Sequence, residues 1–174
     1  MKKKEEQVVL VDSEDRALGL KNKQGAHVEG LLHRAISIFV FNDKNELMLQ
    51  QRASHKYHSR LLWANICCSH PRQGEAVSEA AHRRLNEEMG FDCPLEERFH
   101  FIYKADLNNG LIEHEFDHVF LGRYEGLPKI NPEEVADWRW INLEELMLNI
   151  EPDSEQYAVW LRIIIEQHAA KLKL

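Results

Sequence analysis

The apolar segments of this chain are short, and two of them are separated by only a few polar residues. Residues 35–41 (AISIFVF) are strand-like, residues 47–51 (LMLQQ) form a second such run, and residues 42–45 (NDKN) lie between them. This pattern predicts two strands joined by a hairpin. It restricts the fold to one built around a sheet.

The rest of the chain predicts further strands at residues 8–11, 99–107, 112–124 and 138–141, with a turn at 108–110. Residues 61–68 are mixed and fit a strand that ends in a turn at Pro71, whereas residues 18–32 and 53–60 are expected to be loops. Strands outnumber helices and meet mostly through hairpins. The predicted class is therefore α+β, a mixed sheet flanked by helices.

Three helices are expected. The first covers residues 76–89, where Val77, Ala81 and Leu85 fall on one stripe and Gly90 is placed to end the helix. A short helix is expected at residues 143–148. Asp153 is expected to cap a longer one, whose buried face would carry Tyr157, Trp160, Leu161, Ile164 and Ile165.

Length and charge limit the classes of protein to which this chain can belong. A chain of 174 residues suits one domain, residues 1–174. No apolar run approaches the roughly 20 residues of a membrane span, and no signal peptide follows the charged start, so we expect a cytoplasmic monomer. The net charge of −7 argues against nucleic-acid or anionic-membrane partners. The three cysteines do not form a disulfide framework.

A thiol and an imidazole lie close together in residues 65–71 (NICCSHP). If this segment is extended, Cys68 and His70 share one face and Cys67 takes the other. An imidazole beside a thiol is a common way to tune a reactive cysteine. Small apolar cysteines also fill protein cores, and this segment alone does not decide between the two.

Two carboxylates share a strand face further along, because Glu113 and Glu115 are two residues apart. Paired carboxylates repel unless the face is wet or holds a cation. A solvent-exposed edge is the alternative. Together with His27, His33 and His70 they would make a mixed nitrogen and oxygen site that suits zinc, manganese or magnesium.

The end of the helix at 76–89 places Glu88 on the apolar stripe, where a carboxylate needs a base or a cation. Arg84, one turn earlier, could supply that base. Arg83 and Glu87 fit a solvated face better. Bases that would suit diphosphate oxygens are scattered through the chain, and they are Lys23, Arg52, Lys56 and Arg84.

Residues 69–90 resemble a Nudix box, with the pattern Ser69-x5-Glu75-x7-Arg83-Arg84-Leu85-x-Glu87-Glu88-x-Gly90. The usual box has glycine in place of Ser69 and glutamate in place of Arg84. The glutamate that is missing serves metal binding and water activation in hydrolytic members. Its replacement argues against ordinary pyrophosphate hydrolysis.

The surrounding segments resemble the type I isopentenyl-diphosphate isomerases over roughly residues 5–168. The motifs that carry the resemblance are His33-Arg34-Ala35, Gln51-Arg52, Asn65-x-Cys67-Cys68-Ser69-His70-Pro71, Glu113-x-Glu115 and Trp160. The resemblance implies a Nudix-like sheet and an enzyme of isoprenoid synthesis. Such an enzyme converts isopentenyl diphosphate into dimethylallyl diphosphate by adding one proton, forming a tertiary carbocation, and removing another proton.

Matched position by position, the resemblance implies roles for individual residues. Cys68 would be the catalytic cysteine, Glu115 the opposing carboxylate and Tyr103 the tyrosine that assists proton transfer. The implied ligands of one divalent metal (Mn²⁺, Zn²⁺ or Mg²⁺) are His27, His33, His70, Glu113 and Glu115. Glu88 would help to hold Mg²⁺ on the diphosphate, beside Lys23, Arg52, Lys56 and Arg84.

Isomerisation through a carbocation needs a dry site, because water would trap the cation. Trp160 could stabilise the cation through its ring face, or it could simply be a core residue of its helix. A Nudix hydrolase is the next candidate and would release phosphate or pyrophosphate. A non-catalytic domain that binds a metal or a diphosphate is the third, and in it Cys68 would be replaceable.

Overall fold

Strand β3 (His33–Phe41) is the centre of the fold in this computed structural model, which describes residues 6–173. It pairs with four other strands: antiparallel with β1 (Gln7–Val11), β4 (Glu46–Arg52) and β6 (Cys67–Ser69), and parallel with β8 (Ile112–Arg123). Segments far apart in the sequence therefore meet on one strand.

The remaining strands extend this sheet. They are β2 (Ala17–Asn22), β5 (Trp63–Asn65), β7 (Leu95–Asp106) and β9 (Val135–Asn142). The helices are α1 (Lys23–Glu29), α2 (Val77–Met89), α3 (Leu143–Ile150) and α4 (Val159–His168), with 3-10 turns η1 (Asn108–Gly110), η2 (Ser154–Gln156) and η3 (Ala169–Leu172). The predicted α+β class and both predicted hairpins are confirmed.

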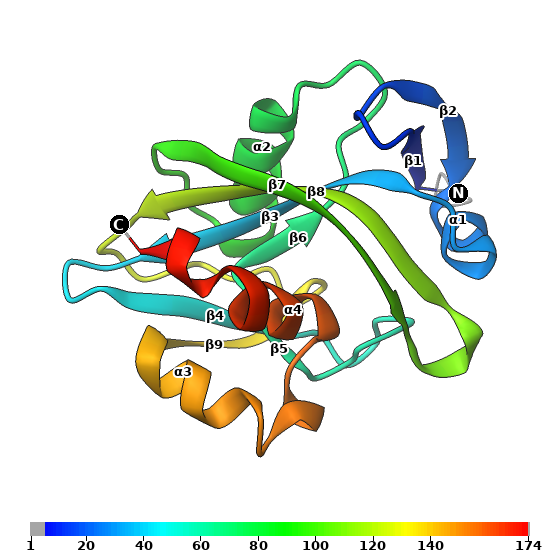
Figure 1. The fold of residues 1–174 in the computed structure, drawn as a ribbon. Helices are drawn as coiled ribbons and strands as arrows, with labels where there is room; N and C mark the ends of the chain where they lie inside the picture. The colour runs from blue at the N-terminus through cyan, green and yellow to red at the C-terminus, as the bar shows by residue number, and fades with distance from the viewer. Residues whose placement is uncertain (1–5, 174) are drawn as a thin grey trace.

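Alternate residues of β3 belong to two different cores. Ile36 and Ile38 pack with α2, whereas Phe39 packs in the cluster that contains α3 and α4. Because successive side chains of a strand point to opposite faces, α2 covers one face of the sheet and α4 the other, as Figure 1 shows. No helix within residues 6–173 is long and apolar enough to cross a membrane.

The predicted helix end at Gly90 is confirmed. Gly90 has φ +69° and its backbone N–H bonds to Asn86 O. A Cβ atom there would lie 2.4 Å from Lys129 O, so the position requires glycine for its backbone angle and for its close neighbour.

The prediction that residues 18–32 form a loop is wrong, because the segment contains β2 and α1. Strand β2 is held by backbone pairing with β1 and is largely exposed, so it carries no apolar alternation. Helix α1 has only seven residues, but its caps are visible in the sequence. The Asn22 side chain accepts a hydrogen bond from Gly25 N, and Gly30 ends the helix in the left-handed conformation.

Asp153 does not cap the last helix. The residues after it form η2, and α4 begins at Val159 with Ala158 as its N-cap. The intervening chain is extended because it is fixed to β5: Ala158 N donates to Trp63 O at 2.9 Å. A tertiary contact therefore overrides the local capping signal. The buried face expected for this helix is correct at Trp160 and Leu161.

Candidate active site

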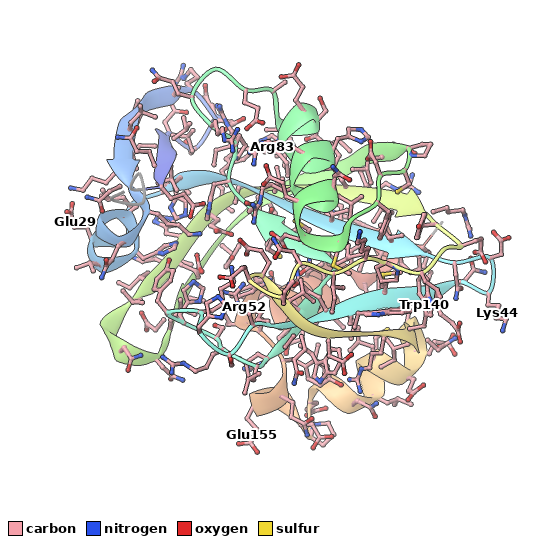
Figure 2. The ribbon with its side chains drawn as sticks, turned by 180° about the vertical axis from the view of Figure 1, so that it is seen from behind. Glu29, Lys44, Arg52, Arg83, Trp140 and Glu155 are labelled. Carbon is pink, nitrogen blue, oxygen red and sulfur yellow. The ribbon has the colours of Figure 1, made fainter. Side chains whose placement is uncertain are left out.

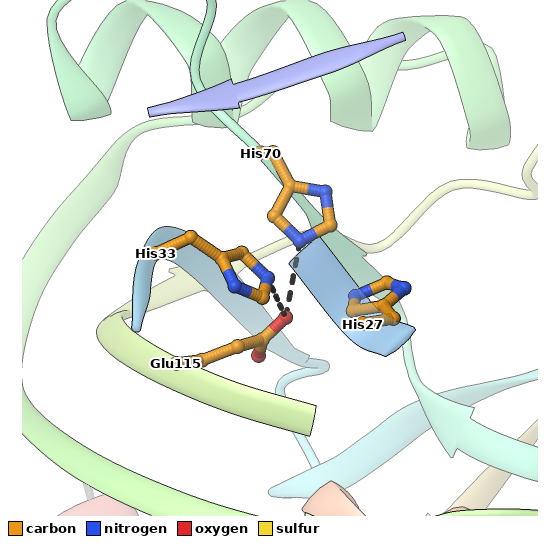
Figure 3. Close-up of side chains that lie close together, drawn as sticks. All are labelled: His27, His33, His70 and Glu115. Carbon is orange, nitrogen blue, oxygen red and sulfur yellow. Dashed lines mark hydrogen bonds and ion pairs between the residues drawn. The ribbon is translucent and has the colours of Figure 1, made fainter. Parts of the chain in front are cut away.

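Side chains from four elements converge on one buried point. His27 lies on α1, His33 begins β3, His70 follows β6 and Glu115 lies on β8. The parallel pairing of β3 with β8 sets His33 opposite Glu115. One ligand atom from each of the four lies within 4.8 Å of the others (Figure 3). The scattered histidines of the sequence are thus brought together.

Glu115 lies at the middle of this group. Its Oε1 atom is 3.1 Å from His70 Nε2 and 3.6 Å from His33 Nε2, the two contacts dashed in Figure 3. Glu113, on the same strand face, has Oε2 at 3.3 Å from His27 Nε2. All five side chains are buried. Four potential metal ligands therefore surround one position, and Glu113 adjoins them through His27.

Several of these buried atoms have no hydrogen-bond partner among residues 6–173, namely His27 Nε2, His33 Nε2 and Glu113 Oε2. The opposite nitrogen of each ring is occupied: His33 Nδ1 bonds to Leu31 O at 2.8 Å, and His27 Nδ1 contacts the Tyr57 hydroxyl at 2.5 Å. Metal-binding histidines are commonly oriented in this way. Buried polar atoms without partners are costly, so the set fits a divalent cation.

The members of the group shift one another's pKa values in different directions, and Glu115 outweighs burial to raise the pKa of His33. Burial would raise the pKa of Glu115, but the neighbouring imidazoles of His33 and His70 outweigh it and hold that pKa well below its usual range. Burial and the neighbouring Glu115 raise the pKa of Glu113. Burial also lowers the pKa of His70 to about 4. His70 is therefore neutral at physiological pH, as a metal ligand must be.

Cys68 lies next to this group with its thiol in a polar setting. Its Sγ atom donates to Asn65 Oδ1 at 3.0 Å and lies 3.6 Å from Ser37 Oγ. Ser37 in turn donates to Asp117 Oδ2 at 2.7 Å. Burial, and then the charge of Asp117, raise the pKa of Cys68 well above its usual value. The thiol is therefore protonated at neutral pH.

Cys67 points to the other side of β6, as the alternation predicted. It is completely buried and packs with Ile66 and Leu85 in the core beneath α2. Cys68 instead packs against the core that contains Trp160. The two neighbouring thiols therefore have different surroundings, and only Cys68 borders the cavity described below.

Tyr103 and Glu115 form a close pair across β7 and β8, where they are register partners. The phenol of Tyr103 donates to Glu115 Oε2 at 2.6 Å. Burial, and then the charge of Glu115, raise the pKa of Tyr103 well above its usual value. The phenol therefore keeps its proton while it bonds to an ionised carboxylate.

Trp160 is a buried core residue of α4, and its ring also contacts polar groups. The guanidinium carbon of Arg52 lies 5.1 Å from the centre of the Trp160 ring, a cation–π distance. His58 approaches the same ring edge-on at 6.0 Å. Figure 2 shows Arg52 well inside the outline of the molecule, whereas Lys44 and Glu155 lie at its edge.

A cavity of about 850 Å³ opens beside Cys68 and His70. Its lining contains all four bases that the sequence singled out, which are Lys23, Arg52, Lys56 and Arg84. Three of them are paired with carboxylates: Lys23 with Glu6 at 3.1 Å, Lys56 with Glu134, and Arg84 with Glu88. Basic side chains thus gather beside the thiol, and carboxylates of the same lining offset part of their charge.

Glu88 points inward, as its place on the helix stripe predicted, and lines the same cavity. Arg84 Nη2 donates to its Oε1 at 2.6 Å, and Gln50 Nε2 donates to its Oε2 at 2.9 Å. A carboxylate has about four acceptor sites, so each oxygen keeps capacity for a further partner. Glu88 therefore fits a second cation at the cavity wall.

Several residues of this site were not found from the sequence. They are Tyr57, Ser37, Asp117, Gln50, Glu6 and Glu134. Asp117 was accessible to the same argument as its neighbours, because it continues the alternation of Glu113 and Glu115. The others come from different elements and carry no spacing signal.

Comparison with known proteins adds relatives with assigned names. A family model described as the NUDIX domain matches residues 31–162. A protein of Aromatoleum aromaticum named Isopentenyl-diphosphate Delta-isomerase 2 is 52% identical over 163 residues, covering 94% of this chain and 86% of the relative. A Photorhabdus laumondii protein of the same name is 54% identical, covering 92% of this chain and 91% of the relative.

Solved structures resemble the fold at low sequence identity. A Deinococcus radiodurans protein, DR0079, aligns with a TM-score of 0.78 at 19% identity, covering 93% of this chain and 98% of that one. The NUDIX domain of Shewanella oneidensis NrtR, solved with ADP ribose, aligns with a TM-score of 0.60 at 17% identity, covering 82% of this chain and 88% of that one. The likeness supports the fold alone.

Proposed function

The chain belongs to the isopentenyl-diphosphate Delta-isomerases of the Nudix family, and we propose that the cavity beside Cys68 is where it carries out this reaction. It converts isopentenyl diphosphate into dimethylallyl diphosphate, a step of isoprenoid synthesis. The substrate is a small molecule. The observation that supports the site most directly is that the protonated thiol of Cys68 lines one cavity with the four basic residues and with His70. The Nε2 atom of His70 lies 3.1 Å from the ionised carboxylate of Glu115.

The reaction moves one double bond. A proton is added to the terminal methylene carbon, which becomes a methyl group, and the neighbouring carbon becomes a tertiary cation. A different proton then leaves the methylene group on the other side of the cation, and the double bond forms there. No atom other than hydrogen is exchanged, so the site needs one proton donor and one proton acceptor.

We assign these two tasks to Cys68 and to the Glu115–Tyr103 pair. The thiol of Cys68 is half-buried and protonated. The phenol of Tyr103 donates a 2.6 Å hydrogen bond to Glu115, so it can relay a proton between the substrate and this carboxylate. Whichever group donates in one direction of the reaction accepts in the reverse direction. Trp160, whose ring already receives the Arg52 cation, would stabilise positive charge on the substrate.

We propose that His27, His33, His70, Glu113 and Glu115 hold one divalent cation, Mn²⁺, Zn²⁺ or Mg²⁺. The imidazole nitrogens and the Glu113 oxygen that make no hydrogen bond within residues 6–173 support this assignment. When bound, the ion would withdraw charge from Glu115 and so tune the acidity of the hydrogen-bonded phenol. In this account Tyr57 and the Leu31 carbonyl orient His27 and His33.

The diphosphate is proposed to bind at Lys23, Arg52, Lys56 and Arg84, with Mg²⁺ held partly by Glu88. Arginine and lysine suit phosphate oxygens through charge-assisted hydrogen bonds. These bases would exchange their present carboxylate partners, among them Glu134, for diphosphate oxygens. Binding of the diphosphate would hold the five-carbon chain in place against Cys68, and such positioning lowers the barrier strongly.

Incubation with isopentenyl diphosphate and Mg²⁺, followed by phosphorus and proton NMR, tests the proposal. Formation of dimethylallyl diphosphate with the diphosphate intact is the expected result. Release of phosphate or pyrophosphate would support a hydrolase, although Arg84 replaces the acid that a hydrolytic Nudix box uses. A cytoplasmic location, a monomeric state and the lack of nucleic-acid or membrane partners stay predictions from the sequence.

A further inference from the structure

A second group of imidazoles and carboxylates lies on β7 and β8, away from the cavity that contains Cys68. Glu97, His100 and His118 each offer one ligand atom, and these atoms lie within 4.8 Å of one another. None of the three lines the proposed active-site cavity. His100 and His118 instead line a separate, shallow depression together with Asp15.

The register of the two strands explains why these side chains meet. His100 and His118 are direct partners across β7 and β8, so their side chains lie on the same face. Glu97 is three residues before His100 and would ordinarily point to the opposite face. A bulge between Glu97 and Phe99 inserts one extra residue and pairs Glu97 with Phe120. Because Phe120 shares a face with His118, the bulge directs Glu97 toward the histidines.

The ring of His118 is held in one orientation by carboxylates on both sides. Its Nδ1 atom lies 2.6 Å from Glu97 Oε1, and its Nε2 atom lies 3.0 Å from Asp15 Oδ2. Asp15 is itself fixed, because Arg34 Nε donates to its Oδ1 at 2.7 Å and Arg34 Nη2 to its carbonyl oxygen. A carboxylate that fixes the far nitrogen of a ring is the usual support of a metal-binding histidine.

His100 is exposed, but rotation of its ring would break a stacking contact. It stacks on Phe116, with ring centres 5.1 Å apart and an angle of 24° between the planes. Because stacking already restricts the ring, His100 would lose less rotamer entropy when it binds a metal. The Glu97 side chain is 38% exposed and can adjust its position.

We propose that Glu97, His100 and His118 form a second metal site, for a borderline divalent ion such as Zn²⁺ or Ni²⁺, with Asp15 orienting His118. Two imidazoles and one carboxylate match the preferences of these ions and leave room for water as a further ligand. With Zn–ligand bonds of about 2.0–2.1 Å, tetrahedral ligand atoms lie roughly 3.3 Å apart. Glu97 Oε1 would need to withdraw from His118 Nδ1 by less than about 1 Å.

Such an ion would bind ligands of the β7–β8 hairpin alone, and the contact of His118 with Asp15 would connect it to the turn between β1 and β2. An ion that binds only the folded chain stabilises it in proportion to the logarithm of its concentration over the dissociation constant. The site is independent of the isomerase reaction, since none of its residues touches the proposed substrate cavity or the His27 group.

The test counts bound ions. The holoenzyme is dialysed to equilibrium against Zn²⁺, and bound zinc per chain is measured by elemental analysis for wild type, His100→Ala and His82→Ala. His82 is a matched control, a half-buried histidine whose Nδ1 lies 2.6 Å from Asp92 Oδ1 and which belongs to no group of three potential ligands among residues 6–173. We expect His100→Ala to bind one zinc fewer than wild type and His82→Ala to bind the same number.

Isomerase turnover is expected to be unchanged in both variants, so loss of the ion is separable from any failure of the active site. Asp15→Asn should retain the stoichiometry and weaken zinc affinity by roughly 10-fold or more, as loss of an orienting carboxylate does. Equal stoichiometry and equal affinity in wild type and His100→Ala would overturn the proposal.

Discussion

The phenol of Tyr103 donates a 2.6 Å hydrogen bond to Oε2 of Glu115, while the other oxygen of Glu115 faces His33 and His70. One carboxylate thus joins the proposed metal position to a proton-bearing group. We expect Tyr103→Phe to lower kcat by about 100-fold, because Glu115 loses the phenol that relays the proton between it and the substrate. Metal content, measured by elemental analysis, should not change. An unaltered kcat would contradict the assigned role.

The two adjacent cysteines provide an internal comparison. Cys68→Ala should abolish measurable turnover, because it removes one of the two proton-handling groups. Cys67→Ala should keep most of the turnover and lower the free energy of unfolding by about 1 kcal/mol, since it leaves a small void beneath α2. Steady-state kinetics and urea unfolding of both variants test this. Equal loss of activity in the two would contradict the face assignment.

Removal of metal should remove activity. Prolonged dialysis against a chelator is expected to stop turnover, and re-addition of Mn²⁺ or Zn²⁺ together with Mg²⁺ should restore it. The chelated protein should also melt at a lower temperature, because an ion that binds only the folded state stabilises it. Full activity in protein shown by elemental analysis to be metal-free would contradict the five-ligand site.

Lys56 tests the diphosphate site. Lys56→Ala should raise KM by roughly 10-fold with little change in kcat, the effect expected on losing one charge-assisted contact that ground state and transition state share. Lys44→Ala is a suitable control, because Lys44 is an exposed lysine at the β3–β4 turn. The same KM in the two variants would place the diphosphate elsewhere.

The Glu75–Arg83 pair predicts a pH dependence of stability. Arg83 Nε and Nη2 donate to the two oxygens of Glu75 at 2.6 and 2.8 Å, and these hydrogen bonds lower the pKa of Glu75. A lowered pKa in the folded state contributes stability above the pKa of the unfolded carboxyl, about 4.3, and this contribution disappears as pH falls through the folded value.

Urea unfolding of wild type and Glu75→Gln should therefore differ at pH 7. The difference should shrink as the pH is lowered from about 5 toward 3. A difference that stays constant over this range would show that the ionised form of Glu75 contributes nothing to stability.

The sequence was most informative where local patterns are strong. The β3–β4 hairpin, the helix that ends at Gly90 and the inward direction of Glu88 follow from periodicity and turn chemistry. It was least informative where backbone hydrogen bonds to another strand, and not a periodic pattern of apolar residues, determine an element. Strand β2 is exposed and held by its backbone, and α4 begins at Val159 because Ala158 bonds to β5.

The candidate site shows the same division. Short-range relations could be predicted from alternation along a strand, which puts Cys67 and Cys68 on opposite faces. The meeting of His33 with Glu115 depends on the parallel register of β3 and β8, which no local pattern encodes. Their grouping was anticipated only through the family resemblance. Ser37 and Tyr57 carry no signal of their own, since their contacts exist only in the folded chain.

The most direct test of the central account is the reaction in deuterated water, followed by proton and deuterium NMR. Isopentenyl diphosphate and Mg²⁺ are incubated with wild type and with Cys68→Ala. We predict that wild type yields dimethylallyl diphosphate with deuterium in a methyl group, and that Cys68→Ala yields none. Allylic product without deuterium, or equal product from Cys68→Ala, would contradict a reaction in which Cys68 and the Glu115–Tyr103 pair transfer the two protons.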